Sequence, residues 1–258
     1  MRYLSVSDLM ESKYYGSRIY PGPDLTDAFR DKCLAVLTAY PQPVHEKIAE
    51  VIKGKSSGKI AIAAQPAQGL PGAMSYLNVD EPDSYLAFYA IEDRALYVPD
   101  VTKYKSSPYR VQPFVTVLHE AVHAFENPNM VDVGWEWPLS ESEAFIDGAF
   151  RPWAQSMREF SDYVFDEGNF TESQRSDFDR MYLYLSDPQE LFADGMAQYY
   201  CKESTHPDSA VRQLHRSLVN DDWLAISLCA KPELKSDLIK ARDGIYEWFA
   251  NYNSPWNK

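Results

Sequence analysis

The chain has only three cysteines, Cys33, Cys201 and Cys229, and they lie far apart in the sequence. This odd number excludes a disulfide framework, and the absence of a C-x-x-C pair argues against a cysteine-ligated structural zinc. The sequence also lacks any apolar run near about 18 residues, which excludes a membrane-spanning helix. Residues 1–8 lack the apolar stretch of a secretory signal. We therefore expect a cytoplasmic protein, or an effector translocated by a route that needs no such signal.

Positive charge is also scarce, with 25 Lys and Arg against 38 Asp and Glu, a formal net charge of −13. Nucleic-acid binding is disfavoured, because it needs a basic surface. The hydrophobic content of 45% in 258 residues is enough for one sizeable core. The Pro21-Gly22-Pro23 break divides the chain into an N-terminal extension (1–24) and a single domain (25–258).

Hydrophobic periodicity predicts helices and a few short strands. We expect an α+β, zincin-like fold, in which a small N-terminal mixed sheet precedes an active-site helix and a mainly helical C-terminal subdomain. A cleft would lie between the part up to about residue 127 and the part from about residue 139. The predicted helices are 25–40, 43–53, 111–125 and segments near 140–163, 171–183, 187–203, 207–219 and 232–252, and the predicted strands are 59–64, 85–91 and 95–98.

The most specific motif is His119-Glu120-Ala121-Val122-His123. Residues i and i+4 of a helix share one face, so the two imidazoles would bind one metal ion. Glu120 follows the first histidine and would act as the general base of a metal-assisted hydrolysis. Apolar residues at helical spacing flank the motif from Phe114 to Phe125, which argues against a chance match on a solvated helix. The motif therefore predicts a zinc hydrolase.

A catalytic zinc needs a third protein ligand. The metzincin extension of the motif is absent, because Glu126 replaces its glycine and Asn129 its third histidine. A downstream carboxylate is expected instead. Glu143 and Glu190 both begin an E-x-F-x-D segment, in which the second acid, Asp147 or Asp194, would hold a ligand histidine.

Each of these two segments also has a purely structural interpretation. Ser140-x-x-Glu143 and Asp187-x-x-Glu190 both resemble capping boxes, in which a glutamate at the third helical position stabilises a helix start. One of the two glutamates is therefore expected to serve only as a cap. Spacing leaves open which one.

With these motifs the chain resembles the gluzincin metallopeptidases. The segment 186–194 is most similar to the E-x-F-A-E segment of the anthrax lethal-factor-like peptidase domain, which the clostridial Pro-Pro endopeptidases share. The resemblance covers roughly residues 25–203 and implies that Zn²⁺ is bound by His119, His123 and Glu190, the last favoured over Glu143. The family tyrosine aligns with Leu183, so either neighbour, Tyr182 or Tyr184, would supply the phenol that stabilises the oxyanion.

The function that follows is a zinc-dependent endopeptidase, in which Glu120 assists the attack of zinc-activated water on a peptide bond. Its partner would be a protein or peptide substrate. The family resemblance suggests a toxin-like bacterial effector that acts on a host protein. Two alternatives stay open: an intracellular housekeeping peptidase, and a non-catalytic interaction protein with a vestigial zinc site. The intact Glu120 counts against the second alternative.

Overall fold

The computed structural model describes ten stretches of the chain. Helices dominate them: the longest helix has 20 residues, whereas no strand exceeds five. The expected α+β class is therefore wrong, and the fold is mainly helical. Statements about structure concern the described residues, which are 3–10, 15–16, 27–52, 60–64, 88–90, 95–98, 113–126, 138–166, 170–220 and 223–251.

Four short strands lie side by side in the order β1-β2-β4-β3. Strands β1 and β4 run parallel to β2, and β3 runs antiparallel to β4 with Tyr89 opposite Leu96. Both of these side chains are buried. With so few residues in each strand, the sheet forms a small platform beside the helices. The strands are β1 (Tyr15–Gly16), β2 (Ile60–Ala64), β3 (Phe88–Ala90) and β4 (Ala95–Val98).

The described part of the predicted N-terminal extension packs on the same core as the rest of the chain. Leu4 and Leu9 are buried, and β1 pairs with β2. Helix α1 (Val6–Met10) contacts α2 (Asp27–Leu37), and α3 (Gln42–Ile52) lies close by. The two helices predicted at 25–40 and 43–53 are thus confirmed as α2 and α3.

Helix α6 (Pro113–Phe125) lies at the junction of the two halves of the fold. It contacts α2, α3, β3 and β4 on one side and α10 on the other. Its apolar residues Phe114, Val117, Leu118, Ala121, Val122 and Phe125 are all buried. The apolar stripe that predicts this helix is therefore its packing surface, and burial of that stripe holds the motif rigidly in place.

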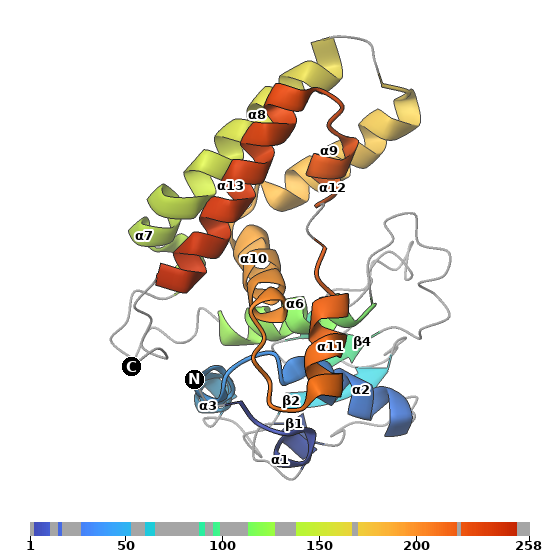
Figure 1. Ribbon diagram of the computed structural model, residues 1–258, viewed down its shortest axis with the longest axis vertical. Helices are drawn as coiled ribbons and strands as arrows, with labels where there is room; N and C mark the ends of the chain where they lie inside the picture. Colours follow the sequence, from blue (N-terminus) through green and yellow to red (C-terminus); the bar gives the residue numbers. More distant parts are fainter. Residues whose placement is uncertain are drawn as a thin grey trace.

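The C-terminal half is a set of packed helices. In Figure 1, α8 and α13 run side by side at the top, and α10 descends from them to cross α6. Helix α9 is preceded by its N-cap residue Thr171, which forms a capping box with Gln174. The elements are η2 (Leu139–Glu141), α7 (Glu143–Phe145), η3 (Ile146–Phe150, a π-helical turn), α8 (Arg151–Asp166), α9 (Glu172–Leu185), α10 (Pro188–Lys202), α11 (Ser209–Ser217), α12 (Leu224–Leu228) and α13 (Pro232–Asn251).

Most of the helical predictions for this half are confirmed, with one interruption. The helix expected near 140–163 is broken into η2, α7 and η3 before α8 begins. Pro152 is the second residue of α8, two positions after η3 ends. A proline inside a helix removes one backbone N–H, which favours such an irregular turn. Among the described helices, none combines the length and apolar character needed to cross a membrane.

Candidate metal centre

The two histidines of the motif lie where α6 faces α10. Their ring centroids are 4.7 Å apart, and their Nε2 atoms are 2.9 Å apart. His119 is 4% exposed, whereas His123 is only partly buried. The short distances between the two rings follow from the i, i+4 spacing on one helical face. One imidazole is thus held inside the protein and the other borders its surface.

Helix α10 brings a carboxylate to this pair. Asp187 caps the helix by accepting a hydrogen bond from the backbone N–H of Gln189 at 2.7 Å, and Pro188 occupies the first turn. This start places Glu190 in the first turn with its side chain toward α6. Its Oε2 atom lies 3.0 Å from Nε2 of His119 and 3.6 Å from Nε2 of His123.

These three side chains fit a zinc ion. Bonds of about 2.0–2.2 Å in tetrahedral geometry put neighbouring ligand atoms about 3.4 Å apart. The three separations among the histidine Nε2 atoms and Glu190 Oε2 are 2.9, 3.0 and 3.6 Å. The donor set, two imidazole nitrogens and one carboxylate oxygen, is also one that zinc accepts. Only small side-chain adjustments are needed for a metal to bind.

Asp194, one helical turn after Glu190, contacts the other nitrogen of His119. Its Oδ1 atom lies 2.9 Å from His119 Nδ1. A hydrogen bond from Nδ1–H to this carboxylate leaves Nε2 with its lone pair toward His123 and Glu190. Burial by itself lowers the pKa of His119, but the charge of Asp194, the hydrogen bonds to Asp194 and Glu190 and the charge of Glu120 outweigh it and raise that pKa well above its usual value. A proton and a metal ion would therefore compete for Nε2.

Glu120 points from the buried side of the motif toward β3. It is 8% exposed, and its Oε2 accepts a hydrogen bond of 3.0 Å from the backbone N–H of Tyr89. Burial raises the pKa of this carboxyl, opposed by the nearby His119 and His123 imidazoles and reinforced by Glu190. A carboxylate with a raised pKa is better matched to accepting a proton near neutral pH.

The structure distinguishes between the two tyrosines. Tyr184 of α9 stacks on His119, and its hydroxyl lies 3.0 Å from Nε2 of that histidine. Although 40% of Tyr184 is exposed, desolvation of its hydroxyl and the charges of Asp194, Glu190 and Glu120 raise its pKa well above the usual value. Tyr182 instead packs against Phe178, with ring centroids 5.7 Å apart. The structure thus brings Tyr184, and not Tyr182, to the histidines.

The competing ligand candidate, Glu143, lies outside this cluster. It begins α7, and its side chain is exposed. The cap of that helix is Ser142, whose Oγ accepts the backbone N–H of Phe145, so the predicted capping role of Ser140 is wrong. Asp147, the second acid of this segment, pairs with Arg151 at 2.8 Å. The first E-x-F-x-D segment therefore serves a helix start and a surface ion pair.

Sequence reasoning overlooked Glu126 as a structural group. This residue directly follows α6, is 5% exposed, and accepts hydrogen bonds from the backbone N–H groups of Leu139 and Ser140. The sequence does contain one indication of this role: Glu126 directly follows the apolar stripe of the motif helix, where an acid exposed to solvent is unexpected.

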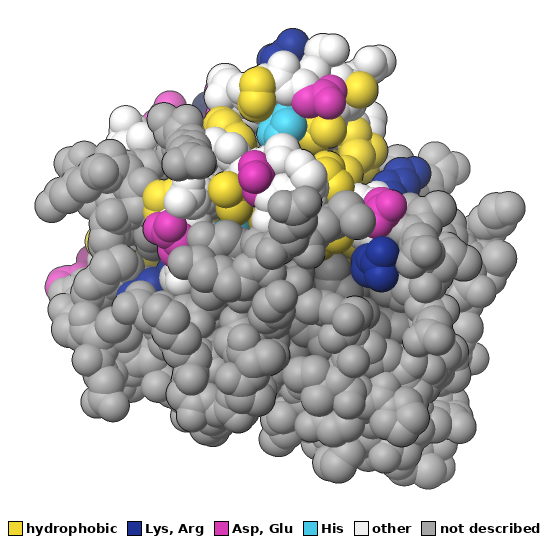
Figure 2. Space-filling model, turned by 90° about the horizontal axis from the view of Figure 1, so that it is seen from below, with side chains coloured by type: hydrophobic (Ala, Val, Ile, Leu, Met, Phe, Trp, Pro, Cys, Tyr) yellow, Lys and Arg dark blue, Asp and Glu magenta, His cyan; other side chains and the backbone are white. Residues whose placement is uncertain are grey.

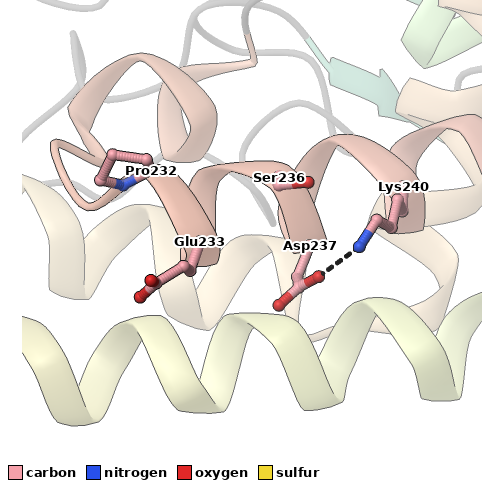
Figure 3. Close-up of a pocket in the computed structure, with 5 residues that line it drawn as sticks. All are labelled: Pro232, Glu233, Ser236, Asp237 and Lys240. Carbon is pink, nitrogen blue, oxygen red and sulfur yellow. Dashed lines mark hydrogen bonds and ion pairs between the residues drawn. The ribbon is translucent and has the colours of Figure 1, made fainter.

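The hollow drawn in Figure 3 belongs to a different part of the molecule. It is lined by Pro232, Glu233, Ser236, Asp237 and Lys240, all from α13. Lys240 pairs with Asp237 at 2.8 Å, so these two charges neutralise each other. The face shown in Figure 2 carries acidic, basic and apolar side chains interspersed over its described part. Neither feature competes with the α6–α10 junction as the candidate site.

Comparisons of the chain with protein-family models, with curated proteins and with solved structures gave no match. The functional assignment therefore rests on the geometry at the α6–α10 junction and on the sequence motif itself.

Proposed function

We propose that the chain is a zinc-dependent endopeptidase of the gluzincin type. The observation that carries the proposal is the meeting of His119 and His123 from α6 with Glu190 from α10 at tetrahedral edge distances. Glu190 lies 67 residues beyond His123 in the sequence, so the fold and not local spacing unites them. His119, His123 and Glu190 would hold the ion, which when bound supplies Lewis-acid activation of water and of a carbonyl group.

The remaining groups have roles that follow from their positions. Glu120 would accept a proton at its carboxylate during attack and return it to the leaving amine. The Tyr89 backbone N–H holds one oxygen of that carboxylate, and the other oxygen would take the proton. Asp194 holds His119 in the tautomer and orientation that ligation needs. The hydroxyl of Tyr184 would donate a hydrogen bond to the developing oxyanion.

The substitution Glu120→Gln tests the proposed function. The amide keeps the shape of the side chain but accepts no proton, so zinc binding should persist while peptide hydrolysis falls at least about 100-fold. Cleavage would be followed by mass spectrometry on a peptide library, with zinc content measured on the same preparation. Wild-type cleavage rates in Glu120→Gln would contradict the role of Glu120.

A further inference from the structure

Glu126 lies just beyond the metal-binding helix and has no ligand role of its own. Its backbone N–H continues the helical pattern with a 2.7 Å hydrogen bond to the carbonyl of Val122. Its side chain is buried, which is costly for a carboxylate unless both oxygens are hydrogen-bonded. What pairs with those oxygens therefore indicates what the residue is for.

Both oxygens accept backbone N–H groups of η2. Oε2 accepts from Ser140 at 2.9 Å, and Oε1 accepts from Leu139 at 3.3 Å. One carboxylate thus satisfies two backbone donors at the start of a buried turn, which would otherwise remain unpaired. These two hydrogen bonds join the end of α6 to the start of η2, although 12 residues separate Glu126 from Leu139 in the sequence.

The turn η2 is also hydrogen-bonded to α10, the helix that carries Glu190. Glu141, at the end of η2, accepts a 2.8 Å hydrogen bond from the side-chain amide of Gln189. Gln189 directly precedes Glu190, and η2 packs against α10. A continuous set of contacts therefore runs from the end of α6 through η2 to the first turn of α10.

We propose that Glu126 is a positioning residue of the metal centre, which sets the distance between His123 and Glu190 through η2 and Gln189. This inference rests on the proposed function, because it assigns Glu126 to the same centre. A carboxylate suits the role because it offers two acceptors in a fixed plane. The isosteric amide of glutamine offers one acceptor and turns two donors toward a backbone N–H.

Zinc affinity and the cobalt spectrum test this role. We expect Glu126→Gln to weaken zinc binding about tenfold or more, measured by chelator competition, and to alter the visible absorption of the cobalt-loaded protein. Gln189→Ala should act in the same direction from the other end of the contact chain. The double variant should lose less affinity than the sum of the two single losses, because both act through η2. Glu143→Gln, an exposed acid beside the same turn, is the matched control and should change neither measurement.

The outcomes separate this inference from the proposed function. Zinc binding at wild-type affinity in both Glu126→Gln and Gln189→Ala would overturn the positioning role while leaving the zinc site intact. A wild-type chain that binds no zinc would overturn the proposed function, and the ¹⁵N signals of the histidine rings in the metal-free protein then decide on Glu126. Shifted His119 and His123 signals in Glu126→Gln support positioning, and unchanged signals contradict it. Should Glu126→Gln fail to fold, Gln189→Ala, a partly buried site that leaves the buried carboxylate in place, carries the same test.

Discussion

At the scale of single residues, His119 is the residue on which the site depends. Its two nitrogens face different charged groups: Nδ1 faces Asp194, and Nε2 faces Glu190 and the imidazole of His123, while the hydroxyl of Tyr184 lies within 3.3 Å of both nitrogens. Such a division fixes the ring orientation before any ligand arrives. No other side chain reproduces the contacts of both His119 nitrogens. The hydroxyl of Tyr184, by contrast, can be removed alone by substitution with phenylalanine.

Replacing Tyr184 by phenylalanine should separate catalysis from metal binding. Removal of one oxyanion donor costs about 100- to 1,000-fold in kcat, whereas KM and zinc content should change little. Tyr182→Phe is the matched control, since Tyr182 packs against Phe178 and should retain nearly full activity. Steady-state kinetics on a cleaved peptide would measure both variants. Equal effects of the two substitutions would contradict the assignment of Tyr184.

Spacing alone predicts the residues of the motif helix, whereas the preference for Glu190 over Glu143 as the candidate third ligand rested on the family resemblance. His119, Glu120 and His123 are adjacent in sequence, so helical spacing alone places them together. Glu143 and Glu190 begin near-identical segments, and only tertiary packing distinguishes the exposed start of α7 from the start of α10 that faces α6. The serine that caps α7 was misassigned for the same reason: Ser140 and Ser142 both suit a cap, and the turn at η2 selects Ser142.

At the scale of elements, α10 is held between α6 and α13. Gly195, one residue after Asp194, allows α13 to approach closely, because a Cβ there would lie 2.7 Å from Cγ2 of Ile245 and 3.0 Å from Phe249. Both of these side chains are buried and have little room to move. The position of Glu190 and Asp194 therefore depends on packing on the far side of their own helix.

Two glycine-to-alanine substitutions test this packing, because they should change the free energy of unfolding in opposite directions. Gly195→Ala should destabilise the protein by about 1–3 kcal/mol through overpacking against α13. Gly244→Ala, within α13, meets nothing within 4 Å and should stabilise it by roughly 0.5–1 kcal/mol, since alanine favours the helix. Urea unfolding would give both values. A stabilising Gly195→Ala would show that α10 and α13 are less closely packed than described.

Element types were predicted better than the fold class. The helices of the C-terminal half follow from 3.6-residue periodicity, which survives in any well-packed helical fold. The class was wrong because a small mixed sheet was expected to define it, whereas the strands found near residues 60 and 95 have only five and four residues and helices make up most of the described structure. Sequence periodicity does not tell how far a strand extends when its pairing partners are distant in the chain.

At the scale of the whole molecule, buried titratable groups link stability to pH. His45 of α3 is fully buried, and desolvation lowers its pKa to about 4. Burial raises the pKa of Glu126 to about 7, against the hydrogen bonds from Ser140 and Leu139. As the pH falls, His45 lowers the free energy of unfolding and Glu126 raises it. Between pH 6.5 and 4 the unfolded chain protonates at His45 and the folded one does not, whereas the folded chain binds the extra proton at Glu126.

Substitution of His45 by glutamine should isolate its contribution. In the wild type, His45 lowers the free energy of unfolding by up to about 1.4 kcal/mol per pH unit as the pH falls from 6.5 toward 4. This component should vanish in His45→Gln, while the Glu126 contribution is present in both proteins and cancels in the comparison. Chemical unfolding over this pH range measures the two slopes. Parallel slopes would contradict a neutral, buried His45 in the folded protein.

The most direct test of the zinc site is the zinc content of matched variants under a fixed concentration of competing chelator. The wild type and Glu143→Ala should each retain roughly one ion per chain, whereas His119→Ala and Glu190→Ala should lose it. Circular dichroism on the same samples would verify that each variant is folded. Full zinc retention in Glu190→Ala together with zinc loss in Glu143→Ala would contradict the site at the α6–α10 junction.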